Sequence, residues 1–211
     1  MIKIENTIIH GWEAAVRGMR NPMNSWDKSD SVYEPELQIG PNDLKLMQNL
    51  SSAGNDHGKF LRFIDVTVDV DAPIYFWKEF ETYRTGVAPH PTEIELNSCS
   101  TMHKIHAEPF NIDHFSHDHL RSMSLEFMDS VIKILNIYRS QFIATKDKAY
   151  WWQIIQLLPS SYNQRRTMHL NYAALKNMYH ARKNHKLDEW RELCAWIESL
   201  PYAKELICDA R

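Results

Sequence analysis

Apolar and polar residues alternate most regularly over residues 62–70. A period of two is typical of a β-strand that buries one face. This stretch therefore predicts a strand, and a second, shorter one is predicted over residues 2–9. We expect the following residues on the buried side of the longer strand: Ile64, Val66, Val68 and Val70.

Apolar residues at helical spacing predict most of the other elements, and proline or glycine marks several of their ends. Helices are expected over residues 11–20, 41–54, 73–84, 148–158 and 171–182. Two further helices are predicted from their apolar faces. The first carries Leu125, Met128, Ile132 and Leu135, and the second carries Leu187, Trp190, Leu193, Cys194 and Ile197. Residues 21–41 and 85–120 predict loops. The pattern indicates an α+β fold with more helix than strand, in a single domain spanning residues 1–211.

The helix predicted over residues 171–182 carries polar residues on an otherwise apolar line. At 100° per residue, Asn171 and Arg182 share one face, with Leu175 and Met178 between them. The two polar residues lie about 16 Å apart along the axis. They could line a long pocket for an elongated anion, or they could be solvated ends of a packing helix. The sequence pattern leaves both readings open.

Composition excludes some classes of function. A formal charge of −3 over 211 residues gives no electrostatic footprint for nucleic acid. Cys99, Cys194 and Cys208 are odd in number and widely spaced, which argues against a disulfide framework and favours a reducing cytoplasm. The first residues lack the apolar region of a signal peptide. No apolar run approaches the roughly 18 residues of a membrane span, so no membrane association is expected.

Histidines gather in the loop-rich segment 85–120. His103, His106, His114, His117 and His119 crowd into a short stretch. His117 and His119 could share a metal if the backbone is extended, but no His-Glu-x-x-His or cysteine pair completes a site. A metal site on an otherwise unrelated helical protein remains one hypothesis, and no metal is the simpler expectation.

Common catalytic and phosphate-binding motifs are missing around the other candidates. Ser98, Cys99 and Ser100 stand in a loop without the Gly-x-Ser-x-Gly elbow of a serine hydrolase. No glycine-rich loop leads from a strand to a helix, so phosphate would have to be bound by arginines. Arg165 and Arg166 predict either an anion contact or a solvated basic turn.

Motifs in a fixed order carry a resemblance to a known family. The first motif is Thr82-Tyr83-Arg84. An insertion separates it from the second, which is Glu95-Leu96-Asn97-Ser98-Cys99-Ser100. Leu158-Pro159 precedes Tyr162, and a helix of the form Asn-x-x-x-Leu-x-Asn-x-x-x-x-Arg begins at Asn171. Over roughly residues 45–200 this order resembles the flavin-dependent thymidylate synthases. The matching residues are Arg84, Asn97, Ser100, Asn171, Leu175, Asn177 and Arg182.

The resemblance implies a fold, a reaction and roles for residues. It implies a small antiparallel sheet among helices, in a homotetramer that binds FAD and dUMP between subunits. NADPH would reduce the flavin, which would pass a methylene group from methylenetetrahydrofolate to C5 of the pyrimidine. Asn97, Asn171 and Asn177 would contact the flavin, Arg84 its phosphates, and Arg182 the nucleotide. Ser100 would bind the nucleotide and take part in catalysis.

Departures from the family pattern bear on the chemistry. Thr82, Met102 and Ile155 stand where the family has arginines. Three lost charge-assisted contacts, at roughly 1.5–3 kcal/mol each, would remove most of the affinity for dUMP in the family's pose. Ala173 also replaces an arginine. The sequence therefore predicts either a divergent enzyme acting on a pyrimidine deoxynucleotide or a non-catalytic oligomeric module that keeps the fold.

Glu79 replaces a nucleotide-binding glutamine of the family. An ionised carboxylate accepts hydrogen bonds but donates none, so it cannot serve the pyrimidine carbonyl that a glutamine amide serves. It could act as an acid or base, or accept from an exocyclic amine such as that of cytosine. Glu79 is therefore a candidate both for catalysis and for substrate binding.

Overall fold

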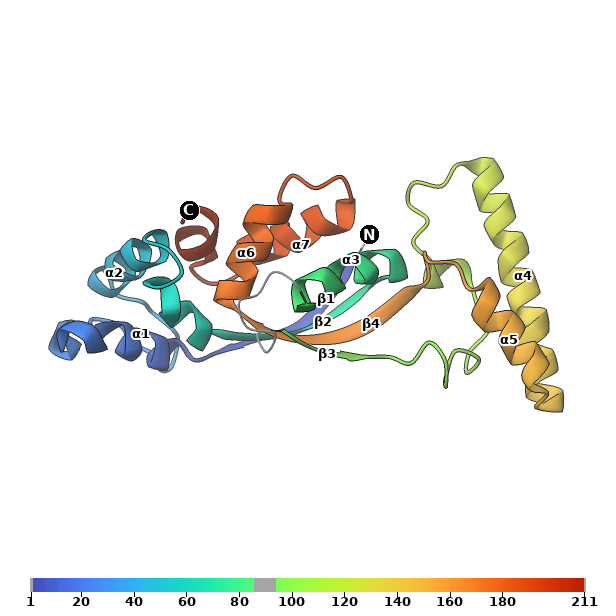
Figure 1. Ribbon diagram of the computed structural model, residues 1–211, viewed down its shortest axis with the longest axis horizontal. Helices are drawn as coiled ribbons and strands as arrows, with labels where there is room; N and C mark the ends of the chain where they lie inside the picture. The colour runs from blue at the N-terminus through green and yellow to red at the C-terminus, as the bar shows by residue number, and fades with distance from the viewer. Residues whose placement is uncertain (1, 86–93, 211) are drawn as a thin grey trace. The chain divides into compact units, whose positions relative to one another are not determined.

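The protein is mostly helical and contains a small antiparallel sheet (Figure 1). The computed structural model describes residues 2–85 and 94–210, without the side chains of residues 83–85. In sheet order the described strands are β1 (Lys3–His10), β2 (Asp65–Pro73), β4 (Asn163–Asn171) and β3 (Glu95–Ser98). The α+β prediction is confirmed.

The helices follow the predicted ranges closely. They are α1 (Trp12–Arg20), α2 (Pro41–Ser52), α3 (Ile74–Thr85), α4 (Ser122–Thr145), α5 (Lys148–Leu157), α6 (Tyr172–Arg182) and α7 (Asp188–Glu198). Short helical turns are η1 (Asn21–Met23), η2 (Trp26–Lys28), η3 (Gly58–Phe63), η4 (Ile112–His114) and η5 (Lys204–Cys208). Within the described part of segment 85–120, β3 and η4 are short, which agrees with its prediction as mostly loop.

The chain forms two compact units. The hairpin unit is made chiefly of Val70–Glu81 and Asn97–Arg166, and the α6 unit chiefly of Ile4–Asp69 and Thr167–Arg211. The backbone passes from one unit to the other within strands such as β2 and β4. The assignment of residues 1–211 to one domain stays a prediction.

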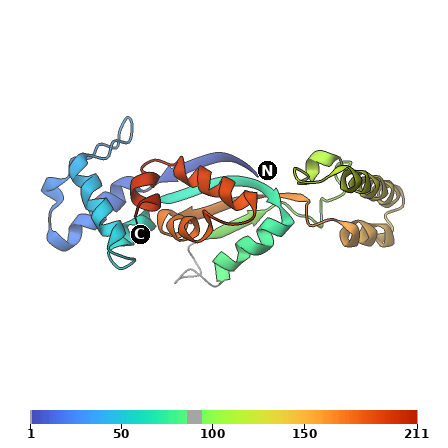
Figure 2. The ribbon, with the colours of Figure 1, turned by 90° about the horizontal axis from the view of Figure 1, so that it is seen from above.

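In the α6 unit, helices α6 and α7 lie on one face of the strands (Figures 1 and 2). Val66 and Val68 of β2 are fully buried, whereas Asp65, Thr67 and Asp69, which alternate with them, are partly exposed. The predicted alternation is therefore confirmed. Burial of these β-branched side chains beneath the helices stabilises the unit by the hydrophobic effect.

The join between β1 and α1 requires glycine. Gly11 has φ of 91°, and a Cβ at this position would collide with the backbone carbonyl oxygen of Phe63. A residue without a Cβ adopts this left-handed conformation without strain. Gly11 therefore lets the chain turn directly from strand into helix against η3.

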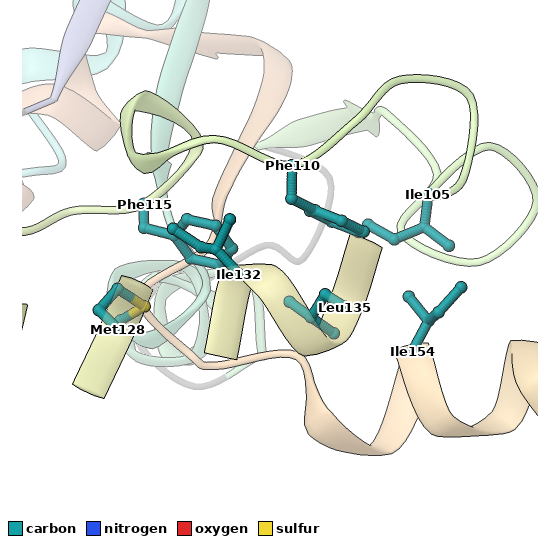
Figure 3. Close-up of a cluster of buried hydrophobic side chains, with 7 residues drawn as sticks. All are labelled: Ile105, Phe110, Phe115, Met128, Ile132, Leu135 and Ile154. Atoms are coloured by element: carbon teal, nitrogen blue, oxygen red, sulfur yellow. The ribbon is translucent and has the colours of Figure 1, made fainter. Parts of the chain in front are cut away.

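In the hairpin unit, α4 and α5 lie side by side (Figures 1 and 2). Figure 3 shows the buried cluster they share with the loop before them, in which Ile105 and Phe110 lie above Leu135 and Ile154. The other members of the cluster are Phe115, Met128 and Ile132. Leu125, predicted on the buried face of α4, is instead 37% exposed, because it precedes the part of α4 that the cluster covers.

One strand was absent from the sequence prediction. β4 contains the Arg165–Arg166 pair that predicted an anion contact or a basic turn. The interpretation as a turn is wrong, because these residues belong to a strand that pairs between β2 and β3. Met168 and Leu170 are buried while Thr167 and His169 are exposed. That short alternation was the available signal.

Candidate functional site

The polar line along α6 is in part a packing face. Leu175 and Met178, between Asn171 and Arg182, are almost completely buried, so no open pocket follows this line. Asn171 is the N-cap of α6, and its Oδ1 accepts a hydrogen bond from the backbone N–H of Ala174 at 2.9 Å. Asparagine at this position satisfies a helix N–H that has no partner within the helix. The structure therefore gives Asn171 a structural role whether or not it also binds a ligand.

Asn177 lies on another face of α6 and lines a small pocket in the α6 unit. The pocket joins α6 to the segment between α2 and β2. It is lined by Ser51, Gly54, Asn55, Gly58, Leu61, Arg62, Ala173, Lys176 and Asn177. Its volume is about 10 Å³, which is room for about one water molecule. The structure thus brings Asn177 of α6 together with the segment around Gly54, which follows α2.

Lys176 is the functional group in this pocket that the sequence analysis missed. Its Nζ donates to the carbonyl oxygen of Ser51 at 2.6 Å and to the Ser51 hydroxyl at 3.0 Å. Burial lowers the pKa of the Lys176 ammonium. With Arg62 and Asn177, it gives the pocket a set of hydrogen-bond donors suited to an anion or a carbonyl. Its position between two matched motif residues was the only signal in the sequence.

Ser100 stands in a turn after β3 in the hairpin unit. Its Oγ accepts from the backbone N–H of His103 at 2.8 Å and from that of Met102 at 3.2 Å. The hydroxyl also lies 3.2 Å from His103 Nδ1. These contacts define a turn closed by a serine side chain. Asn97, three residues earlier on β3, is exposed.

Ser100 also lines a cavity of about 330 Å³ within the hairpin unit. The cavity walls include Cys99, Lys104, Glu108 and Tyr162. Burial raises the pKa of the Tyr162 hydroxyl, so this group stays protonated and can donate a hydrogen bond. A cavity of this size with charged and hydroxyl groups can admit a small polar ligand.

The remaining carboxylate and arginine candidates lie on α3 and β4. Glu79 is half-buried on α3, and the side chain of Arg84 lies outside the described residues. Arg166 Nη1 binds Glu81 Oε1 at 2.6 Å, and its guanidinium stacks 4.6 Å from the centre of the Trp77 ring. Arg166 is therefore held by the protein's own groups rather than offered to an anion.

Arg182 ends α6, where its Cζ lies 5.1 Å from the centre of the Trp190 ring. This stacking holds the plane of the guanidinium against the indole ring. Within the α6 unit, Asn171 and Arg182 lie at opposite ends of the helix. Asn177, which lies between them in the sequence, lines the small pocket described above.

Residues 2–85 and 94–210 contain no group of three or more His, Cys, Asp or Glu side chains arranged to hold a metal ion. His117 Nδ1 lies 2.8 Å from the carbonyl oxygen of Phe115. In the same described residues, no helix is long and apolar enough to cross a membrane. All three cysteines are free thiols.

Comparison with known proteins adds the decisive observation about the fold. No protein-family model matches the chain, and no curated protein sequence matches it. A crystal structure of thymidylate synthase X from Helicobacter pylori with FAD and dUMP superimposes with a TM-score of 0.73 at 15% identity, covering 100% of this chain and 99% of that one. The chain has the fold of a flavin-dependent thymidylate synthase.

A second structure of the flavin-dependent synthase from Helicobacter pylori, complexed with FAD and dUMP, matches with a TM-score of 0.69 at 16% identity. It covers 99% of both chains. The predicted resemblance to this fold is therefore confirmed across the whole chain, including the α4–α5 hairpin. At this identity the agreement establishes the fold, and the roles of residues stay predictions.

The residues of this thymidylate synthase fold meet the demands of a flavin only in part. Arg62, Lys176 and Asn177 offer donors to the polar end of a dinucleotide, whereas Ala173 offers none. The pocket encloses about one water molecule, so it does not accept a ring system within one protomer. If a flavin binds here, Arg62, Lys176 and Asn177 are the residues that would hold its polar groups.

Proposed function

We propose that the chain is a divergent flavin-dependent thymidylate synthase-like protein that binds FAD and a pyrimidine deoxynucleotide. The agreement of fold over essentially the full length of both chains carries this proposal. The two similar structures hold FAD and dUMP, and the matched residues Asn177, Asn171 and Arg182 all lie on or next to one helix of the shared fold. NADPH is the proposed reductant and the cytoplasm the proposed location.

The donors around Asn177 are the proposed contact for the flavin. Lys176 is fixed by Ser51 and supplies positive charge, and Arg62 adds a guanidinium. When bound, FAD would supply hydride and one-carbon transfer chemistry. The protein's own groups would orient it and offset the charge of its phosphates. We assign Arg84 and Asn97 to the same cofactor by their match to the family motif.

The nucleotide is proposed to be read by Arg182, Ser100 and Glu79. The replacement of a glutamine by Glu79 favours a base that donates a hydrogen bond, such as cytosine, over uracil. Ser100 and Glu79 are also the proposed catalytic groups. This choice of base is a hypothesis, and it fails if dUMP raises the melting temperature while dCMP has no effect.

Self-association is part of the proposal, and α4 supports it. Six large apolar side chains on this helix are exposed, and four of them form a stripe along it: Met123, Phe127, Ile134 and Ile137. They recur at spacings of four, seven and three residues, which follows a seven-residue repeat and is typical of helix pairing. A second copy with the same stripe is the simplest partner, and a homotetramer is the proposed assembly.

The visible spectrum of purified protein tests the function. We expect flavin absorbance at about one FAD per chain after FAD is added back and free FAD is removed. Replacing Lys176 with Met should weaken FAD retention by about tenfold, because a charge-assisted contact is lost. Lys45→Met, an exposed change on α2, is the matched control. Failure of the unmodified protein to bind FAD at micromolar concentration would contradict the proposal.

A second candidate is a non-catalytic oligomeric module that keeps the fold. The hydrogen bonds of Asn171 and Ser100 favour it, since each side chain is explained by the stability of its own helix or turn. The same spectrum separates the two functions. A stable oligomer that binds neither FAD nor a nucleotide would support the module.

A further inference from the structure

A second, larger cavity lies in the hairpin unit, where the turn between α4 and α5 meets the loop after β3. Its volume is about 480 Å³, within the range of roughly 300–1,000 Å³ typical of small-molecule sites. None of the residues assigned above to FAD or nucleotide lines it. Three of its lining side chains are apolar or aromatic: Met102, Phe142 and Trp151.

The loop after β3, which forms one wall of this cavity, is hydrogen-bonded to both α4 and α5. Asn136 of α4 donates to the carbonyl oxygen of Phe110 at 2.8 Å and accepts from its N–H at 2.8 Å. Arg139 donates to the carbonyl oxygens of His106 and Ala107. Trp151 Nε1 donates to the carbonyl oxygen of Met102 at 3.1 Å. The wall is thus held in place by side chains from α4 and α5.

The buried cluster of Figure 3 holds the same loop from within. Ile105 and Phe110 pack with Leu135 and Ile154, and all four side chains are at least 95% buried. A loop fixed by both packing and hydrogen bonds presents its side chains in defined positions. Such preorganisation lowers the conformational entropy that the loop loses when a ligand binds.

The rest of the lining is basic: His103, His106, Lys146 and Lys148. The Nζ of Lys148 lies 5.9 Å from the Trp151 ring centre, and that of Lys146 lies 6.0 Å from the Phe142 ring centre. The one carboxylate in the α4–α5 turn, Asp147, accepts from the N–H of Ala149 as the N-cap of α5. The cations therefore face the cavity beside flat aromatic walls.

The surroundings of His106 also show that this cavity is lined by aromatic and positively charged groups. Its ring packs edge to face on Phe142, with centres 4.8 Å apart, and its Nδ1 is buried with no hydrogen-bond partner among the described residues. Burial lowers the pKa of His106, and the charges of Lys146, Lys104 and Arg139 lower it further. An incoming anion would offset that positive field and could accept a hydrogen bond from the ring.

We propose that this cavity binds a ligand that joins a flat aromatic ring system to a carboxylate or phosphate. The ring would lie between Phe142 and Trp151, and the anionic group would pair with Lys146, Lys148 and the His106 ring. This proposal stands on the hairpin unit alone and does not depend on FAD binding.

Calorimetry with matched probes tests the site. 2-Naphthoate and 2-naphthyl phosphate share a ring system and differ in the anion, so they distinguish the two sources of charge. We expect the dissociation constant of at least one of them to be about tenfold lower than that of 2-naphthamide, acetate or inorganic phosphate. Binding should also raise the pKa of His106, measured from its ring signals by nuclear magnetic resonance.

Variants locate the binding. Lys148→Gln combined with Lys146→Asn should weaken binding of the preferred probe about tenfold; asparagine tolerates the left-handed backbone of Lys146, whose φ is 58°. Lys133→Gln is the control, an exposed lysine on α4 about 20 Å away along the helix. The proposal would be overturned if 2-naphthamide bound as tightly as both 2-naphthoate and 2-naphthyl phosphate, or if the His106 pKa stayed unchanged when the preferred probe saturates the protein.

Discussion

At the scale of single residues, Asn171 serves the backbone of α6 and is a candidate for the flavin. Its Oδ1 already accepts from Ala174 N–H, and the side chain is buried. A carboxamide still keeps its NH2 group for a ligand. Structural and ligand roles can therefore coexist in this side chain, and they separate by experiment.

Asn171→Ala should lower the free energy of unfolding by about 1 kcal/mol, because it removes the cap of α6. Asn171→Asp should largely keep the cap, since a carboxylate also accepts from Ala174 N–H, while it loses the NH2 donor. Urea denaturation of both variants measures the cap, and FAD retention measures the ligand contact. An Asn171→Ala protein as stable as the unmodified one would refute the capping role.

At the scale of elements, an ion pair ties α1 to α2. Arg20 Nε binds Asp43 Oδ1 at 2.6 Å, and both side chains are almost fully buried. Burial alone would raise the pKa of the Asp43 carboxyl, but hydrogen bonds outweigh it and the pKa lies below the ordinary value of 3.8. The donors are the side chains of Ser31, Ser29 and Arg20 and the backbone N–H of Asp30.

This pair predicts how stability depends on pH. A depressed pKa means that the Asp43 contribution is fully present above about pH 4 and is lost as the pH falls through the folded-state pKa. Asp43→Asn should cost about 3–5 kcal/mol at pH 7, since it leaves Arg20 buried without a carboxylate. The difference between the two proteins should shrink below pH 3.8. Urea titrations across pH measure it, with exposed Asp27→Asn as the control, and a difference independent of pH would exclude this mechanism.

The elements also show how far the sequence could reach. Strong periodicity and proline or glycine boundaries predicted β2, α2, α3 and α5 to within a few residues. The sequence did not predict β4, because only Met168 and Leu170 mark its buried face and polar residues fill its first half. Its strand state depends on pairing with β2 and β3, which lie far away in the sequence.

The candidate site was predictable only where motif order sufficed. The resemblance singled out Asn177, which lines a pocket, and its contact with a flavin stays a prediction. The contact of Lys176 with Ser51 joins residues 125 positions apart, so no local pattern could predict it. The apolar line through Leu175 and Met178 could not be told from a ligand face without knowing what packs on α6. Long-range packing, rather than local pattern, decides such cases.

At the scale of the whole molecule, the exposed stripe of α4 predicts an oligomer. Phe127 is 70% and Ile137 is 56% exposed, although both are large and apolar. Covering these side chains with the same stripe of a second copy removes apolar surface from water at about 25 cal/mol per Å². A seven-residue repeat lets the side chains of two helices interlock. We therefore expect a mass in solution above the 24.9 kDa of one chain.

The double variant Phe127→Gln with Ile137→Gln should shift this assembly toward smaller species at low micromolar concentration, while far-ultraviolet circular dichroism stays unchanged. Met23→Gln is the matched control, because Met23 is 81% exposed but lies on η1, outside the stripe. Light scattering coupled to size exclusion measures the mass. If a second copy also covers the mouth of the Asn177 pocket, the double variant should lose FAD together with the assembly. An assembly of unchanged mass would exclude α4 as the contact between copies.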